Sequence, residues 1–105
     1  MTLYLLNSPV LTDHGLWRFA PLCIDAAREL AAGGFVSAIG HEGAARLLGE
    51  LLKKEVEVSR IRVHLAPGDR AIVLRVRERL PEGVVLDRAA LDLTDWELSL
   101  LTRLE

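Results

Sequence analysis

The first forty residues carry two short apolar runs that predict buried strands. Thr2–Leu6 and Phe35–Ile39 are mostly apolar and contain residues that favour extended structure. Runs that are apolar on both faces are typical of strands covered on both sides of a sheet. We therefore expect both strands to be buried, and the first one to be central.

Two amphipathic segments predict helices. Pro21–Ala32 places apolar residues at helical spacing, with Pro21 near the start and Gly33–Gly34 as the stop. The second helix runs from His41, directly after Gly40, to about residue 54, and its apolar stripe consists of Ala44, Leu47, Leu48 and Leu51. Strands and helices in this order predict a single α/β domain.

The second half of the chain predicts a hairpin. Polar and apolar residues alternate in Arg60–Leu65, which is typical of a half-buried strand, and a turn at residues 66–69 leads into a returning strand, Arg70–Glu78. The register that matches the apolar faces sets Arg60 opposite Arg75. Because like charges opposed across a ladder repel, either neighbouring acids or a bound anion should offset them, unless the face is simply solvated.

The last quarter of the chain predicts shorter elements. A turn at residues 79–83 is followed by a short extended piece, Val84–Leu86, and by one or two helical turns over Asp87–Leu93. Alternation returns in Trp96–Leu100, which predicts the final strand.

Composition limits the class of protein and its partners. Of the 105 residues, 50% are apolar and 27% charged, which predicts one folded domain and excludes disorder. The net charge of −2 gives no overall attraction to nucleic acid, so a polyanion would need a local cluster of arginines. The apolar start, Met1–Leu6, is too short for a signal peptide or a membrane span, so we expect a cytoplasmic protein without a membrane partner. The lone Cys23 predicts a small buried residue.

His41 is the residue best placed for chemistry. A helix start offers backbone N–H groups without intrahelical partners, at the positive end of the helix dipole, and anions bind there. A histidine can give a proton to a leaving oxygen at neutral pH, and arginines such as Arg60, Arg75 and Arg79 can bind phosphate oxygens. Glu82 lies just beyond them. This set predicts phosphate chemistry, although a role of His41 as a cap or a packing residue stays open.

Other classes of site find little support in the sequence. The three histidines lack the close spacing of metal ligands, and no P-loop, dinucleotide or GxSxG motif is present, so we expect no metal and no cofactor. Two loops allow alternatives. Val10–Ala20 is either a lid over a ligand or a surface loop whose aromatic residues tuck into the core. Asn7 either stabilises a turn or presents its amide to a ligand at a strand end.

Three motifs together resemble those of a known family. Val36–Glu42 contains Ile-Gly-His, Tyr4–Asn7 lies upstream, and Arg79–Gly83 reads Arg-Leu-Pro-Glu-Gly. With these motifs the chain resembles, over nearly its whole length, the viral type III anti-CRISPR ring nucleases, which are small proteins of archaeal viruses, phages and bacteria.

The resemblance implies a mixed sheet of about five strands flanked by helices. It also implies a homodimer that holds cyclic tetra-adenylate, a second messenger of type III CRISPR defence, across its two-fold axis. Cleavage would switch this signal off without a metal: a ribose 2′-hydroxyl attacks the adjacent phosphorus and leaves linear products with 2′,3′-cyclic phosphate ends. No long nucleic acid is expected as a partner.

The resemblance also implies roles for individual residues. His41 would be the general acid, Arg79 would hold the scissile phosphate, and Glu82 would orient the reacting groups or accept a proton. The ligand-binding set would be Asn7, Ser8, Gly40, Arg60 and Arg75. Where some viral relatives have a hydroxyl residue, this chain has Gly43, so a backbone N–H would have to replace that contact. Two other functions stay open: a non-catalytic dimer that sequesters a cyclic nucleotide or nucleic acid, and a structural dimer whose arginines serve solubility.

Overall fold

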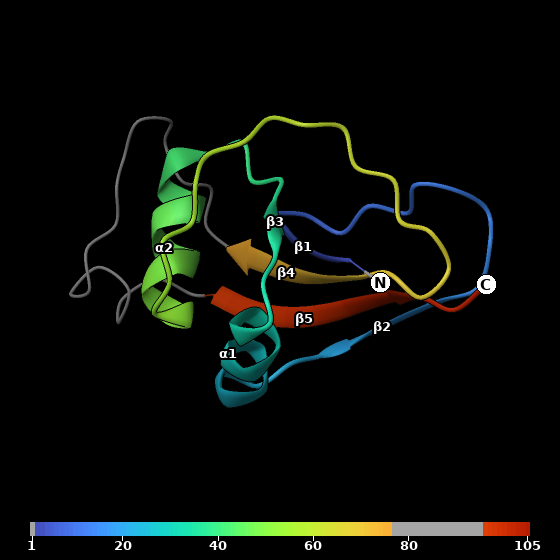
Figure 1. Cartoon of the computed structure of the whole chain (residues 1–105), viewed down its shortest axis with the longest axis horizontal. Helices are drawn as coiled ribbons and strands as arrows, with labels where there is room; N and C mark the ends of the chain where they lie inside the picture. Colours follow the sequence, from blue (N-terminus) through green and yellow to red (C-terminus); the bar gives the residue numbers. More distant parts are fainter. Residues whose placement is uncertain (1, 77–95) are drawn as a thin grey trace.

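One mixed sheet of five strands organises the structure (Figure 1). The structure is a computed structural model that describes residues 2–76 and 96–105. In chain order its elements are β1 (Leu3–Leu6), β2 (Trp17–Pro21), α1 (Ile24–Ala32), β3 (Val36–Ser37), α2 (Glu42–Leu52), β4 (Arg70–Val76) and β5 (Trp96–Arg103). The strands lie in the order β2-β5-β4-β1-β3, so the mixed sheet of about five strands with flanking helices is confirmed.

The strand directions give the sheet two distinct ends. β1 is parallel to β3 and β4, whereas β5 is antiparallel to β4 and β2. We call the end at which β1, β3 and β4 finish the carboxyl end. At the opposite, amino end, the first residue of β2, Trp17, pairs with the last residue of β5, Arg103. In open α/β sheets, ligands usually bind at the carboxyl end.

The two faces of the sheet are covered by different kinds of structure. On one face the strands pack against α1 and α2 through Leu3, Leu5, Ile72, Leu74 and Leu98. On the other face Leu65, which is fully buried, packs with Leu6, Ala71, Val73 and Leu101. Leu65 belongs to residues 55–66, which form neither helix nor strand and which we call the strap. The strap therefore covers part of the face that the helices leave open.

The predicted hairpin is wrong. Because β4 lies between β1 and β5, neither of its edges is available to residues 60–65. The alternation that predicted a strand reflects contact with the sheet face, since Leu65 is buried whereas Ile61 is 47% exposed. The turn into β4 is confirmed: the Asp69 N–H donates to the Ala66 carbonyl oxygen at 2.9 Å.

An edge strand precedes the first helix, which therefore starts later than predicted. The loop expected over residues 10–20 contains most of β2, and Pro21 is the last residue of that strand. A proline, which has no N–H, is tolerated on an edge strand. Cys23 is the N-cap of α1 and is exposed, so the expectation of a small buried cysteine is wrong.

The strand before His41 is shorter and less buried than predicted. Only Val36 and Ser37 of the apolar run form a strand, and Val36 is 39% exposed because β3 lies at the edge of the sheet. β1, by contrast, is an inner strand whose Leu5 is fully buried, as expected. The predicted stripe of the second helix is confirmed, since all four of its residues are buried.

The final strand is confirmed and extends as far as Arg103. The turn at residues 79–83, the extended piece Val84–Leu86 and the helical turns of Asp87–Leu93 lie outside the described residues, as do the last two residues predicted for the strand before them. Within the described ranges, no helix is long and apolar enough to cross a membrane.

Candidate functional site

His41 is the N-cap of α2, in the short connection from β3. Its backbone is extended, with φ −119° and ψ 123°, and its ring Nδ1 accepts a hydrogen bond from the Ala44 N–H at 3.3 Å. The His41 carbonyl oxygen accepts from the Ala45 N–H at 3.0 Å, which begins the helical ladder. The prediction that His41 opens a helix is confirmed. The cap role that the sequence left open is also present.

The cap contact determines which ring nitrogen of His41 carries the proton. Because Nδ1 accepts the Ala44 N–H, the neutral ring is protonated on Nε2. In this state the ring can donate a hydrogen bond through Nε2. A fully protonated ring can give up a proton to a leaving group, but Nδ1 can then no longer accept from Ala44. Acid catalysis at His41 therefore requires the cap bond to open or exchange.

Arg60 reaches from the strap to the same connection. Its Nε donates to the Gly40 carbonyl oxygen at 3.0 Å. A Cβ atom added at Gly40 would lie 2.8 Å from the Arg60 Cγ, so the arginine stem passes directly over the glycine. A glycine at this position is therefore explained by the close approach of Arg60. The structure brings three predicted residues together here: Gly40, His41 and Arg60.

Two hydrogen bonds to backbone carbonyl oxygens hold this part of the strap beside β3 and the residues that follow it. The Ser59 N–H donates to the Ile39 carbonyl oxygen at 2.8 Å. The Ser37 hydroxyl donates to the Glu57 carbonyl oxygen at 2.6 Å. These two bonds fix the strap at residues 57 and 59. They bring Arg60, the residue after Ser59, to the start of α2.

Arg75 does not face Arg60, as the predicted hairpin required. It lies on β4 directly opposite Glu97 of β5, and its Nη1 is 2.9 Å from the Glu97 Oε1. Of the alternatives that the sequence offered, a neighbouring acid is present beside Arg75. Both side chains are substantially exposed, at 51% and 35%. The predicted opposition of Arg60 and Arg75 is wrong because the strap is not part of the sheet.

Asn7 and Ser8 are exposed directly after β1, at the carboxyl end of the sheet. The last registered pair of β1 and β4 is Leu6 with Val73, and Arg75 follows two residues later along β4. Asn7, Ser8 and Arg75 therefore lie at the same end of the sheet, the carboxyl end. Arg79 and Glu82 lie outside the described residues, so their roles stay predictions.

The local charge at the start of α2 has two opposing contributions. The first turn offers backbone N–H groups to an anion, and Arg60 adds a positive charge beside Gly40. Glu42, which is exposed, places an acid in the same turn. Gly43 has no side chain and is buried, so this position adds no exposed polar group to the site.

Other candidate sites in the described residues do not include the residues predicted for this chemistry. No group of three or more His, Cys, Asp or Glu residues in those ranges could hold a metal ion. A cavity of about 750 Å³ lies between α1 and α2, and Arg28, Arg46, Lys54 and Trp96 are among the residues that line it. None of the predicted site residues within the described ranges lines this cavity.

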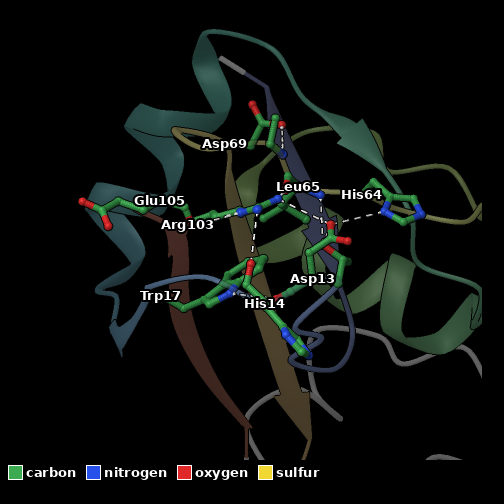
Figure 2. Close-up of polar contacts among 10 residues, drawn as sticks. Asp13, His14, Trp17, His64, Leu65, Asp69, Arg103 and Glu105 are labelled. Atoms are coloured by element: carbon green, nitrogen blue, oxygen red, sulfur yellow. Dashed lines mark hydrogen bonds and ion pairs between the residues drawn. The ribbon is translucent and has the colours of Figure 1, made fainter.

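The loop proposed as a possible lid is fastened at the amino end of the sheet. Figure 2 shows the polar contacts that fasten it, with Arg103 at their centre. Its Nη1 donates to the Leu65 carbonyl oxygen at 2.6 Å and lies 3.4 Å from the Asp13 carboxylate, while Nη2 donates to the His14 carbonyl oxygen at 3.3 Å. The guanidinium carbon also lies 5.7 Å from the centre of the Trp17 ring. These contacts favour a fixed surface loop over a lid.

Sequence reasoning did not identify Arg103. The signal that could have found it is the alternation of β5, which places Arg103 on the same face as the buried residues Ser99 and Leu101. An arginine on such a face needs acceptors for its five N–H groups, and backbone carbonyl oxygens in nearby loops can supply them. We call Arg103 and the groups it contacts in residues 13, 14, 17, 65 and 105 the clasp.

Asp69 fastens the turn beside the clasp. Its carboxylate accepts from the Thr2 N–H and from the Ala66 N–H, each at 2.9 Å. The bond from Thr2, with a smaller contribution from Ala66, lowers the pKa of this carboxyl below its usual value despite its burial. Asp69 therefore serves the structure of the amino end.

Comparison with known proteins supports the fold and gives the family. The uncharacterized protein YddF of Bacillus subtilis (strain 168) is 31% identical, and the match covers 100% of both chains. The uncharacterized protein 26 of Sulfolobus islandicus filamentous virus is 34% identical over 80% of this chain and 75% of its own. Among solved structures, B116 of Sulfolobus turreted icosahedral virus has the same fold: its TM-score is 0.81 at 20% identity, with 98% of this chain and 100% of that chain covered. A family model described as STIV B116-like matches residues 3–98, and the chain therefore belongs to the STIV B116-like family.

Proposed function

We propose that the protein is a metal-independent ring nuclease that opens cyclic tetra-adenylate and acts as a homodimer. The observation that carries the proposal is the meeting of His41, Gly40 and Arg60 at the start of α2. A proton donor, a cation and the positive end of a helix dipole within one connection are the components that cleavage of a phosphodiester needs. The resemblance of the sequence motifs to ring nucleases supplies the substrate class.

The reaction uses a nucleophile that belongs to the substrate. The ribose 2′-oxygen forms a bond to the adjacent phosphorus while the bond from phosphorus to the 5′-oxygen breaks. The 5′-oxygen takes a proton from the His41 ring and leaves as a hydroxyl, and the 2′-hydroxyl proton passes to a base. The products carry a 2′,3′-cyclic phosphate at one end and a 5′-hydroxyl at the other. Alignment of the attacking oxygen and transfer of the proton are the contributions asked of the protein.

Several residues have roles in this proposal. Arg60 neutralises phosphate charge on cyclic tetra-adenylate. Gly40 lets the Arg60 side chain approach the start of α2. Asn7, Ser8 and Arg75 contact the ring from the carboxyl end of the sheet. Arg79 holds the scissile phosphate and Glu82 serves as orienting group or base, by resemblance alone. Two identical half-sites related by a two-fold axis suit a ligand with four-fold chemical symmetry.

The protein incubated with labelled cyclic tetra-adenylate in excess chelator tests the proposal. We expect linear products with 2′,3′-cyclic phosphate ends, which are separated from 3′-phosphate ends by phosphatase treatment. Ring that stays intact but bound would support a sequestering protein instead. Absence of both cleavage and binding, for rings of several sizes, would leave only a structural role. Sedimentation of the same sample measures whether a dimer forms.

The sequestering function has one observation in its favour. The His41 ring already caps α2, and this role stabilises the helix without any chemistry. A binder would need the same anion-binding helix start and the same arginine. The chelated cleavage assay separates the two functions because both predict binding and only one predicts a product.

A further inference from the structure

The strap is anchored to the protein at two places. Near the candidate site, the Ser59 N–H and the Arg60 Nε bind the carbonyl oxygens of Ile39 and Gly40. The second anchor lies at the amino end of the sheet and is made by Leu65. Between the anchors, residues 61–64 form no helix or strand, and Ile61 is 47% exposed. The strap therefore joins the candidate site to the clasp.

The second anchor holds Leu65 from both sides of its peptide. Its carbonyl oxygen accepts from the Arg103 Nη1 at 2.6 Å, and its N–H donates to the Thr12 hydroxyl at 3.2 Å. The Arg103 side chain is 16% exposed, so the bond from its charged group is largely shielded from water. The neighbouring His64 Nδ1 lies 3.5 Å from the Asp13 carboxylate, which Arg103 also contacts (Figure 2).

We propose that Arg103 is a positioning residue for Arg60 and acts through the strap. The inference rests on the proposed function, in which Arg60 binds the ring. A segment without a hydrogen-bonded ladder is ordered by the fixation of its ends, since closing both ends removes most of its alternative conformations. When the clasp opens, the strap gains conformational freedom from Leu65 back toward Ser59. Arg60 then spends less time over Gly40, and the ring loses a preorganised cation.

The geometry of the clasp explains why an arginine is needed. The guanidinium places its three nitrogens in a rigid fork, and here they reach the carbonyl oxygens of Leu65, His14 and Glu105. A lysine has one ammonium group and cannot reach all three in the same way. Arg103→Lys keeps the charge and should give a partial effect, whereas Arg103→Gln removes both charge and fork.

Amide hydrogen exchange tests the strap independently of any activity. In Arg103→Gln we expect exchange of the Ser59 amide to accelerate about tenfold or more, because a charge-assisted bond that anchors the strap is lost. The amide of Leu48, which is fully buried in α2, should exchange at the rate of the parent protein. Arg18→Gln on β2 is the matched control, since Arg18 is an exposed arginine in the strand beside β5.

Steady-state kinetics tests the link to the ring. We expect Arg103→Gln to raise KM about fivefold to tenfold and to leave kcat within about twofold, because Arg60 contributes to binding rather than to proton transfer. Arg103→Lys should restore part of this loss. A purely structural role would instead lower the active fraction, which changes the apparent kcat and leaves KM unaltered.

Thr12→Val weakens the same anchor by removing the other hydrogen bond of Leu65. It provides a second test if Arg103→Gln does not fold. It removes the acceptor of the Leu65 N–H at nearly constant volume. Ser59 protection equal to that of the parent in a folded variant of either kind would overturn the inference. If the parent protein does not cleave the ring, the proposed function fails, and the exchange measurement still decides whether the clasp orders the strap.

Discussion

The two ends of the sheet use polar side chains on backbone groups in contrasting ways. At the amino end, the Arg103 nitrogens bind carbonyl oxygens of three separate residues, and Asp69 binds the N–H groups of Thr2 and Ala66. At the carboxyl end, His41 uses Nδ1 to cap α2, while the proposed chemistry needs Nε2. A polar side chain whose groups are satisfied by backbone is structural. The cap bond of His41 fixes its ring at the start of α2, and the proposed chemistry requires that bond to open.

This difference explains why the contacts of the loop favour a fixed surface loop over a lid, and why His41 stays the candidate for chemistry. Asp13 and His14 looked like a polar tip that could close on a ligand, yet they lie beside Arg103 at the end opposite to His41. His41 directly follows Gly40, and Arg60, 20 positions after Gly40, contacts that glycine. Convergence on a helix start, rather than polarity alone, distinguishes the candidate site.

The largest expected effect is on turnover by His41→Ala. Loss of general acid catalysis should lower kcat by about 100-fold to 10,000-fold. The same change removes the cap of α2 and should cost about 1 kcal/mol in the free energy of unfolding. Ring-cleavage rates and chemical unfolding measure the two losses. His14→Ala, in the fastened loop at the other end, is the control and should leave kcat within about twofold of the parent. Equal loss in both variants would contradict the contrast between the two ends.

Asp69→Asn should give the largest loss of stability at the amino end. One of its two charge-assisted bonds to backbone N–H groups disappears, so we expect a cost of about 1 to 3 kcal/mol at neutral pH.

The pH dependence follows from the lowered pKa of Asp69. A carboxyl whose pKa is lower in the folded state stabilises the fold above its unfolded pKa, and this contribution is lost as the pH falls through the folded pKa. The difference between parent and variant should therefore narrow in acid. Urea unfolding at pH 7 and near pH 3 measures it. A difference that stays constant would mean that the Asp69 charge is irrelevant.

Gly40→Ala tests the close approach at the carboxyl end. The new Cβ would lie 2.8 Å from the Arg60 Cγ and should displace the arginine, which we expect to raise KM about tenfold or less. Gly33→Ala is the matched control, because its Cβ would meet its nearest atom, the Leu30 carbonyl oxygen, at 3.6 Å. Ring affinity and KM are the readouts. A folded Gly40→Ala variant with unchanged KM would show that the position of Arg60 does not matter for ligand binding.

The smallest expected effect concerns the ion pair of Arg75 and Glu97. Both side chains are substantially exposed, so a double-mutant cycle with Gln at each position should give a coupling of less than about 1 kcal/mol. A rise in KM for Arg75→Gln without a loss of stability would assign Arg75 to the ring. An unchanged KM would show that Arg75 does not bind the ligand and serves only the surface of the sheet.

The sequence predicted the elements whose periodicity is decided by burial. β1, the stripe of α2 and the final strand all follow from apolar spacing, and His41 follows from the break at Gly40. The strap was misread because Val63 and Leu65 alternate as in a strand, although they pack on a sheet face without joining the ladder. β2 was missed because it is an edge strand, where exposed residues carry little pattern.

The candidate site was only partly predictable for a related reason. The contact of Arg60 with Gly40 spans 20 positions and depends on a segment without regular structure, so local pattern cannot indicate it. The pairing of Arg75 with Glu97 depends on the order of strands, which the predicted hairpin set wrongly. Arg103 was not predicted because several of its partners are backbone carbonyl oxygens. Every residue has such an oxygen, so the sequence does not show which ones will accept a hydrogen bond.

The most direct test of the central claim is single-turnover cleavage of cyclic tetra-adenylate by His41→Asn in chelator. Asparagine is a favourable N-cap, so this variant keeps the start of α2 while removing the proton donor. We predict unchanged thermal stability and ring affinity, with a cleavage rate at least about 100-fold below that of the parent. A rate within about twofold of the parent would show that His41 only caps the helix and that the chemistry lies elsewhere.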